Sequence, residues 1–303
     1  MKIHLKLIIC LSLLFAGYAF SSVQGTLRGV VKDKKGNPIE GVKVTIISLK
    51  YSMVKIVVKT NKNGEFIQIG LQPDYYQVRG EKEGYQPIFF EKRVPMAQTV
   101  DANFELEEGH RIIGEPPGLK DFERGNGLFK AGTYEGAAKA YLDAIQKEPQ
   151  ETIYRNNLGI CYSKLEKYDE AIEAFKSMLQ LQANSYSANR SLGELFGLQK
   201  KYQEALPFFA KATELSPDDP EAFYNLGACL VNTQDSAKAM EAFLRAKELK
   251  PDYANAYYQL GMIFINQNRK EEAVQHLEKF LELAGPQDPN ASLARQLLDY
   301  LKK

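Results

Sequence analysis

The chain has 303 residues, a length that suggests about two domains. Its 39 Lys and Arg residues balance 38 Asp and Glu residues, so no bulk charge points to nucleic acid or to a strongly acidic partner. Hydrophobic residues make up 44% of the sequence, which is typical of a globular protein with a buried core and excludes a mainly disordered chain.

Residues 1–19 have the pattern of a cleaved secretory signal peptide. Lys2 and Lys6 give a basic start, an apolar run follows over residues 7–15, and Gly17 and Ala19 place small residues where a signal peptidase reads. We therefore expect an exported protein that is periplasmic, at the cell surface or extracellular. The alternative is an uncleaved membrane anchor, although the apolar run is short for a span. No later stretch of the sequence is long enough to cross a membrane.

Residues 24–108 alternate short β-rich runs with turns that contain Gly, Asn and Pro. About seven strands in so few residues predict a small all-β sandwich. The expected strands are residues 27–31, 42–47, 55–60, 65–69, 75–81, 88–94 and 99–106.

Three segments of this region, GVVKDKKGNPIEGVKVTI, TNKNGEF and LQPDYYQVRGEKEGY, resemble in their order the carboxypeptidase regulatory-like family, a transthyretin-like sandwich. The resemblance covers most of residues 25–107 and implies no peptidase activity. Because similar folds bind glycans, carbohydrate or cell-surface binding by the sandwich is the alternative function. The aromatic residues considered for stacking on a sugar are Tyr51, Tyr75, Tyr85 and Phe89, and ordinary core packing is the other explanation for them.

Residues 109–117 form the expected linker, in which Pro116 and Pro117 favour an extended, fairly stiff spacer. A 34-residue pattern then repeats five times, and a fixed period of this size indicates a helical solenoid. The units are residues 118–151, 152–185, 186–219, 220–253 and 254–287.

Each unit carries Gly, Ala and a large apolar residue at fixed positions, as in Gly227, Ala239 and Phe243. Because Gly inside a helix costs about 1 kcal/mol relative to Ala, five glycines at one position need a structural reason. We expect a crossing of two helices there, at which Gly lies against Ala. The columns are Gly125, Gly159, Gly193, Gly227 and Gly261; Ala137, Ala171, Ala205, Ala239 and Ala273; Tyr141, Phe175, Phe209, Phe243 and Leu277.

At these residues the chain resembles the tetratricopeptide repeat (TPR) family, in which five helix pairs would stack into an all-α superhelix. Residues 288–303 are expected to add a capping helix that begins at Asp288 and Pro289. Its apolar face is predicted to consist of Leu293, Leu297, Leu298 and Leu301.

The TPR resemblance implies that the first helix of each pair lines a concave groove that binds a protein or an extended peptide. Asn and Gln side chains offer both hydrogen-bond donors and acceptors, so a row of them can hold a peptide backbone. The alternative is that Asn is simply the common residue of this repeat. The candidate groove residues are Asn126, Asn157, Arg190, Tyr224, Asn225, Tyr258 and Gln259.

Candidate catalytic or metal-binding residues are scarce. Beyond the leader the histidines are His110 and His276, and Cys161 and Cys229 lie two units apart, too far for a disulfide in a stacked solenoid. No zinc spacing, P-loop or nucleophile elbow is present. We therefore expect a non-enzymatic interaction or scaffold protein without a cofactor or metal, with a protein or peptide partner and no nucleic acid.

Overall fold

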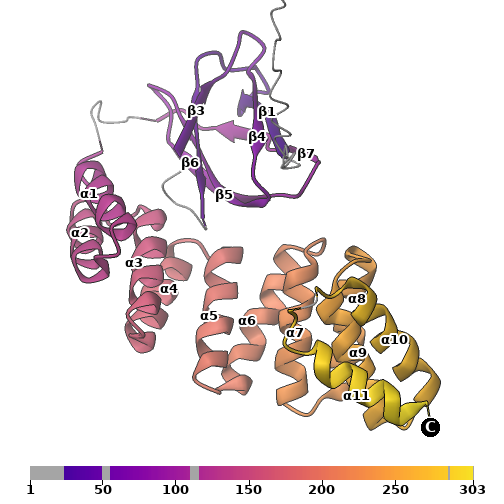
Figure 1. Ribbon diagram of the computed structural model, residues 1–303. Helices are drawn as coiled ribbons and strands as arrows, with labels where there is room; N and C mark the ends of the chain where they lie inside the picture. The colour runs from indigo at the N-terminus through magenta and orange to yellow at the C-terminus, as the bar shows by residue number, and fades with distance from the viewer. Residues whose placement is uncertain (1–23, 50–54, 110–115, 286, 303) are drawn as a thin grey trace, which may run out of the picture.

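The computed structural model describes residues 24–49, 55–109, 116–285 and 287–302. The expected signal peptide, Tyr51, His110 and most of the linker lie outside these ranges. Figure 1 shows a β-domain beside a row of helix pairs, with the sandwich over the early pairs and the last helices extending past it. The expected combination of an all-β sandwich with an all-α solenoid is confirmed.

The β-domain consists of two sheets. In the first sheet β1 lies between β4 and the short strands β7 and β8, and in the second sheet the order is β3-β2-β5-β6. Eight strands are described where about seven were expected, because the expected strand 99–106 is split into two. The strands are β1 (Gly25–Asp33), β2 (Lys43–Ser48), β3 (Lys55–Lys59), β4 (Glu65–Leu71), β5 (Asp74–Glu81), β6 (Ile88–Val94), β7 (Thr99–Asp101) and β8 (Phe104–Leu106).

The split occurs where the chain contacts β1 closely. β7 and β8 both run parallel to β1, and between them the Ala102 amide donates to the Arg28 carbonyl while the Asn103 side chain accepts from the Val30 amide. Gly29 permits this approach, because a Cβ there would lie 2.3 Å from the Ala102 carbonyl oxygen. The alternating residues of β1, such as Leu27 and Val31, point into the core between the sheets.

The solenoid consists of five antiparallel helix pairs and one further helix. Within each pair the two helices are joined by a tight turn, and consecutive pairs pack side by side. The helices are α1 (Leu119–Lys130), α2 (Tyr134–Lys147), α3 (Thr152–Lys164), α4 (Tyr168–Leu181), α5 (Tyr186–Leu198), α6 (Tyr202–Leu215), α7 (Pro220–Asn232), α8 (Ser236–Leu249), α9 (Ala254–Asn266), α10 (Lys270–Leu283) and α11 (Ala291–Leu301). No helix of the described residues is long and apolar enough to span a membrane.

In the first four units the repeated glycine lies against a ring, and in the fifth Gly261 lies against the Leu277 side chain, which corrects the expected Gly–Ala crossing. A Cβ on Gly159 would lie 2.6 Å from the Phe175 ring, and a Cβ on Gly227 would lie 2.7 Å from the Phe243 ring. The alanine column is fully buried nearby, but the closest atoms that exclude a side chain belong to the column of large residues. In the first four units the flat ring of the second helix thus packs directly on the backbone of the first.

Each turn within a pair contains one residue in the left-handed backbone region. These five residues stand at the same position of successive units, and four of them are not glycine: Gly132, Glu166, Lys200, Gln234 and Asn268. A side chain in this region is disfavoured by contact between Cβ and the backbone, so the four turns without glycine carry a local conformational cost.

The last helix, α11, begins at Ala291, later than the expected start at Asp288 and Pro289. Asn290 precedes its first turn, and the Asp288 carboxylate accepts from the Asn290 amide in the loop before the helix. Leu298 packs on the last pair, as expected, but Leu293 is 44% exposed and therefore lies outside the buried face.

Candidate functional site

The outer face of the second sheet lies on the amino-terminal ends of three helices, α3, α5 and α7 (Figure 1). Alternate residues of β5 and β6 form this face. Tyr75 of β5 lies opposite Arg93 of β6, and Gln77 of β5 lies opposite Glu91 of β6. Side chains two residues apart in a strand point to the same face of the sheet. Several side chains of this one strand pair therefore point toward the solenoid, and together they contact three consecutive helix pairs.

At α3 the contact is a buried ion pair. The Arg79 guanidinium binds the Glu151 carboxylate, and the two side chains are 15% and 5% exposed. Gln77 adds a hydrogen bond of 3.0 Å to the Thr152 hydroxyl. Burial raises the pKa of Glu151, while the charge of Arg79 acts in the opposite direction. Arg79 also contacts Glu81 at 3.1 Å, so it is shared between a carboxylate of each domain.

At α5 the sandwich supplies the carboxylate. Glu91 accepts from the hydroxyls of Ser185 and Ser187 at 2.6 and 2.9 Å, and from the Ser187 amide at 3.0 Å. A carboxylate is favoured at this place because the first amides of a helix lack partners within the helix. Burial raises the pKa of Glu91, and the serine hydroxyls and the backbone amide act to lower it.

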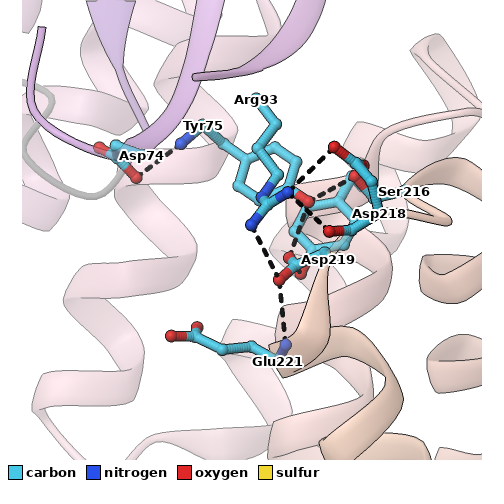
Figure 2. Close-up of polar contacts among 8 residues, drawn as sticks. Asp74, Tyr75, Arg93, Ser216, Asp218, Asp219 and Glu221 are labelled. Atoms are coloured by element: carbon cyan, nitrogen blue, oxygen red, sulfur yellow. Dashed lines mark hydrogen bonds and ion pairs between the residues drawn. The ribbon is translucent and has the colours of Figure 1, made fainter. Parts of the chain in front are cut away.

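At α7 a tyrosine and an arginine of the sandwich meet a buried carboxylate (Figure 2). The Tyr75 hydroxyl lies 2.6 Å from the Ser216 hydroxyl and 2.8 Å from the Asp219 carboxylate. Arg93 contacts Asp219 at 3.6 Å and Asp218 at 3.1 Å. Asp219 in turn accepts from the Glu221 amide and so caps α7.

The charges of the two domains are complementary. Glu151, Ser185 and Asp219 occupy the same position in three consecutive units. The two acidic residues, Glu151 and Asp219, each contact an arginine of the sandwich, whereas Ser185 donates a hydrogen bond to Glu91 of the sandwich. This alternation fixes which repeat each part of the sheet contacts.

Apolar packing accompanies these polar contacts. Ile47 and Leu49 of the sandwich are 7% and 5% exposed and belong to the same hydrophobic cluster as Phe122, Tyr154 and Leu158 of the solenoid. The two domains are therefore in direct contact, which the expected spacer did not predict.

A cleft of about 1140 Å³ lies beside this contact. One wall belongs to the sandwich and includes Tyr75, Arg93 and Met96, and the other belongs to the inner helices, chiefly α3 and α5. The inner helices of the solenoid and the sandwich thus form the cleft together.

Of the seven candidate groove residues, Arg190 alone is among the described residues that line this cleft. Asn157 is 2% exposed, and its amide donates to Asn126 at 3.0 Å and to the Tyr141 hydroxyl at 3.4 Å. Asn157, expected to line a groove, is therefore buried by a polar network within the first two units.

The remaining candidates lie on the later helices. Tyr224 packs between the rings of Phe243 and Tyr253, with centroid distances of 5.5 and 5.3 Å. Tyr258 packs on Phe280 at 5.1 Å. Both tyrosines, together with Asn225 and Gln259, are partly exposed and do not line the described cleft.

The structure also locates the residues considered for other roles. Tyr75 faces the solenoid and Tyr85 packs against the sandwich core, so neither is an open platform for a sugar. The His276 ring lies near Phe264 and contacts the Glu272 carbonyl, and burial lowers its pKa. Within the described ranges no group of three His, Cys, Asp or Glu residues could hold a metal ion.

Sequence reasoning missed the cleft residues of the sandwich. The sequence pattern of the sandwich places Tyr75 in a strand, where it is considered for stacking on a sugar. The same pattern does not identify Arg93 or Met96 as site residues. A usable signal was the run of three charged residues, Glu91, Lys92 and Arg93, in a strand that is otherwise apolar over residues 88–94. The local sequence of that strand does not predict that its charged side chains contact helices more than 90 residues away.

Family comparisons agree with this division of the chain. A carboxypeptidase regulatory-like domain model matches residues 26–107. Tetratricopeptide repeat models match residues 149–218, 198–256 and 254–286. No sequence among curated proteins matched the chain.

Solved structures share the solenoid fold. A crystal structure of MamA is 26% identical, with 52% of this chain and 93% of that chain covered and a TM-score of 0.51. MamA from Desulfovibrio magneticus RS-1, starting at residue 41 of that protein, is 24% identical, with 58% and 99% covered and a TM-score of 0.54. YrrB, a TPR protein with an unusual peptide-binding site, is 24% identical, with 61% and 94% covered and a TM-score of 0.53.

Proposed function

We propose that this chain, which joins a carboxypeptidase regulatory-like domain to tetratricopeptide repeats, is an exported, non-enzymatic scaffold that binds a protein or extended peptide. The repeats support the general role, because stacked helix pairs present an extended concave surface to partners. The observation that most supports this role is the cleft of about 1140 Å³ that the sandwich forms with the inner helices. A cleft of this size would hold several residues of an extended chain.

The sandwich, on this proposal, is part of the binding site. Its contacts with α3, α5 and α7 hold Met96 and Arg93 beside the inner helix face. A preformed wall lowers the cost of ordering the site when a partner binds. The unusual peptide-binding site of YrrB, a protein with a solenoid of the same fold, is in keeping with this use of the repeats.

Export is proposed from the leader pattern, with its basic start, apolar run and small residues at 17 and 19. Amino-terminal sequencing of the protein from the extracytoplasmic fraction should find a chain that begins near Phe20. An intact Met1 in a cytoplasmic pool would rule export out.

The binding proposal is tested by site-specific photo-crosslinking in the full chain. A photoreactive residue replaces Ser191, which lines the cleft, and in a control replaces Glu173, which is exposed on α4. Mass spectrometry should identify the same partner peptide at Ser191 in repeated preparations and not at Glu173. Equal yields at the two positions would reject the cleft as the binding surface.

A further inference from the structure

The cleft has a specific chemistry along α5, the inner helix of the third unit. Arg190, Glu194 and Leu198 follow one another at intervals of one turn and all line the cleft. Tyr186 at the start of α5 contacts the sandwich, so the cleft runs along the helix from the sandwich toward Leu198.

Leu198 is the apolar position of this row. Its side chain is 63% exposed, and Met96 on the sandwich wall is 61% exposed. Large apolar side chains from two domains thus border one cleft, and exposed apolar surface of this kind is typical of interaction sites. Met96 precedes Ala97, which has a positive φ of 57°, so the loop accepts a disfavoured conformation beside the cleft.

Glu194 is the charged position. Its carboxylate lies 3.7 Å from the Arg190 guanidinium, and Glu221 of α7 lines the same cleft as a second carboxylate. Among the described residues that line the cleft, six carry carboxylates and four carry cationic groups, so carboxylates are in excess. Partial desolvation raises the pKa of Glu194, and the charge of Arg190 lowers it. The charge of Glu221 raises the pKa further. A positive group from a partner would relieve the repulsion between the two carboxylates.

Arg190 is the hydrogen-bonding position. Its Nε is buried, and within the described residues it has no hydrogen-bond partner. The side chain as a whole is 33% exposed, so the outer nitrogens of the guanidinium can donate to the carbonyl of an extended peptide in the cleft.

We infer that the cleft binds an extended peptide in which a basic residue and an apolar residue are two positions apart. Residues i and i+2 of an extended chain share a face and lie about 6.6 Å apart. Glu194 and Leu198 are separated by one helical turn, about 6 Å along α5. The basic side chain therefore faces Glu194 and Glu221 while the apolar one packs on Leu198. This inference rests on the proposed function and specifies the partner that the cleft accepts.

The test uses three fluorescein-labelled peptides with the full chain. The first has the core Lys-Ser-Leu between Gly and Ser residues, the second replaces its Lys by Glu, and the third replaces its Leu by Ser. Fluorescence polarisation should show the first peptide binding at least tenfold more tightly than either of the others, a difference of about 1.4 kcal/mol.

Protein variants assign the effect to the cleft. Combined Glu194→Gln and Glu221→Gln should abolish the preference for Lys over Glu, and Leu198→Ser should abolish the preference for Leu over Ser. Leu142→Ser is the matched control, since Leu142 is 46% exposed on α2 and does not line the cleft. Equal binding of the three peptides, absence of binding, or preferences that survive these substitutions would overturn the inference. If crosslinking at Ser191 still captures a partner in that case, the general binding function stands and the specificity alone fails.

Discussion

Tyr75 of β5 stacks on Tyr186 of α5, with ring centroids 3.8 Å apart and planes 8° from parallel. Both hydroxyls donate to the same carboxylate, that of Asp219, at 2.8 and 2.7 Å. Burial raises the pKa of each tyrosine, and the charge of Asp219 adds to the effect, so both hydroxyls keep their protons. A strand of the sandwich, the start of α5 and the cap of α7 therefore meet at one point, where Figure 2 shows Tyr75 beside Asp219.

Tyr75→Ala should loosen the contact between the domains. It removes a stacked ring pair, worth about 0.5–1.5 kcal/mol beyond its buried area, and hydrogen bonds worth about 0.5–1.5 kcal/mol each. Hydrogen exchange should increase for amides of β5, β6 and the first turns of α5 and α7. Tyr300→Ala is the control, because Tyr300 is 77% exposed. If the two variants exchange alike, the stacked pair does not hold the domains together.

Arg79 and Glu151 should show strong coupling. Removing one partner of a buried ion pair leaves an uncompensated charge and costs about 3–5 kcal/mol, whereas replacing both by apolar residues costs much less. We expect a large loss of unfolding free energy for Arg79→Met and a partial recovery when Glu151→Leu is added, measured by urea denaturation. Lys279→Met breaks an exposed pair with Glu282 and should cost less than about 1 kcal/mol. Additive effects at Arg79 and Glu151 would contradict the coupling.

Local patterns predicted each domain but not their contact. The strand at 88–94 and the repeated Gly, Ala and aromatic columns depend on neighbours within one strand or one unit, so the sequence displays them directly. Glu91 meets Ser185 only because two domains dock, and this relation has no period or spacing that reveals it. The same holds for Asn157: its position in the repeat predicts a groove residue, whereas its burial depends on Asn126 and Tyr141 of the preceding unit.

Glu166→Gly should stabilise the solenoid. Glu166 closes the turn between α3 and α4 with a positive φ of 57°, a conformation that costs a side-chain-bearing residue about 1–2 kcal/mol. Glycine removes this strain but loses more chain entropy, about 0.5–1 kcal/mol, so we expect a net gain of up to about 1 kcal/mol. Thermal unfolding measures it. Lys139→Gly, at an exposed position within α2, should instead cost about 1 kcal/mol. A loss of stability for Glu166→Gly would show that its side chain makes a stabilising contact.

Cys161 should be unreactive in the folded protein. Burial raises the pKa of its thiol to about 12, and the thiolate is the reactive form. At pH 8 only about one thiol in ten thousand would be ionised, against roughly a quarter for a free cysteine. In a background with Cys10→Ser and Cys229→Ser, alkylation of Cys161 should therefore be slow in buffer and rapid in denaturant. Fast labelling of Cys161 in buffer would show that the second unit opens readily.

Asn157 and Asn225 occupy one column two units apart, yet they should respond differently to alanine. Asn157→Ala removes donors to Asn126 and Tyr141 inside a buried network, so we expect a loss of about 1–3 kcal/mol in unfolding free energy. Asn225 is partly exposed and, among the described residues, makes no side-chain hydrogen bond, so Asn225→Ala should change stability by less than about 0.5 kcal/mol. Urea denaturation of the two single variants measures this difference.

The same pair separates stability from binding. If the groove extends from the cleft to α7, Asn225→Ala should weaken binding of the crosslinked partner tenfold or more, about 1.4 kcal/mol, with an unchanged melting temperature. Gly227→Leu is the contrasting variant, because even a Cβ there would lie 2.7 Å from the Phe243 ring, and it should lose both folding and binding. Native affinity in Asn225→Ala would instead confine the site to the cleft, which Ser191 of the same column already lines.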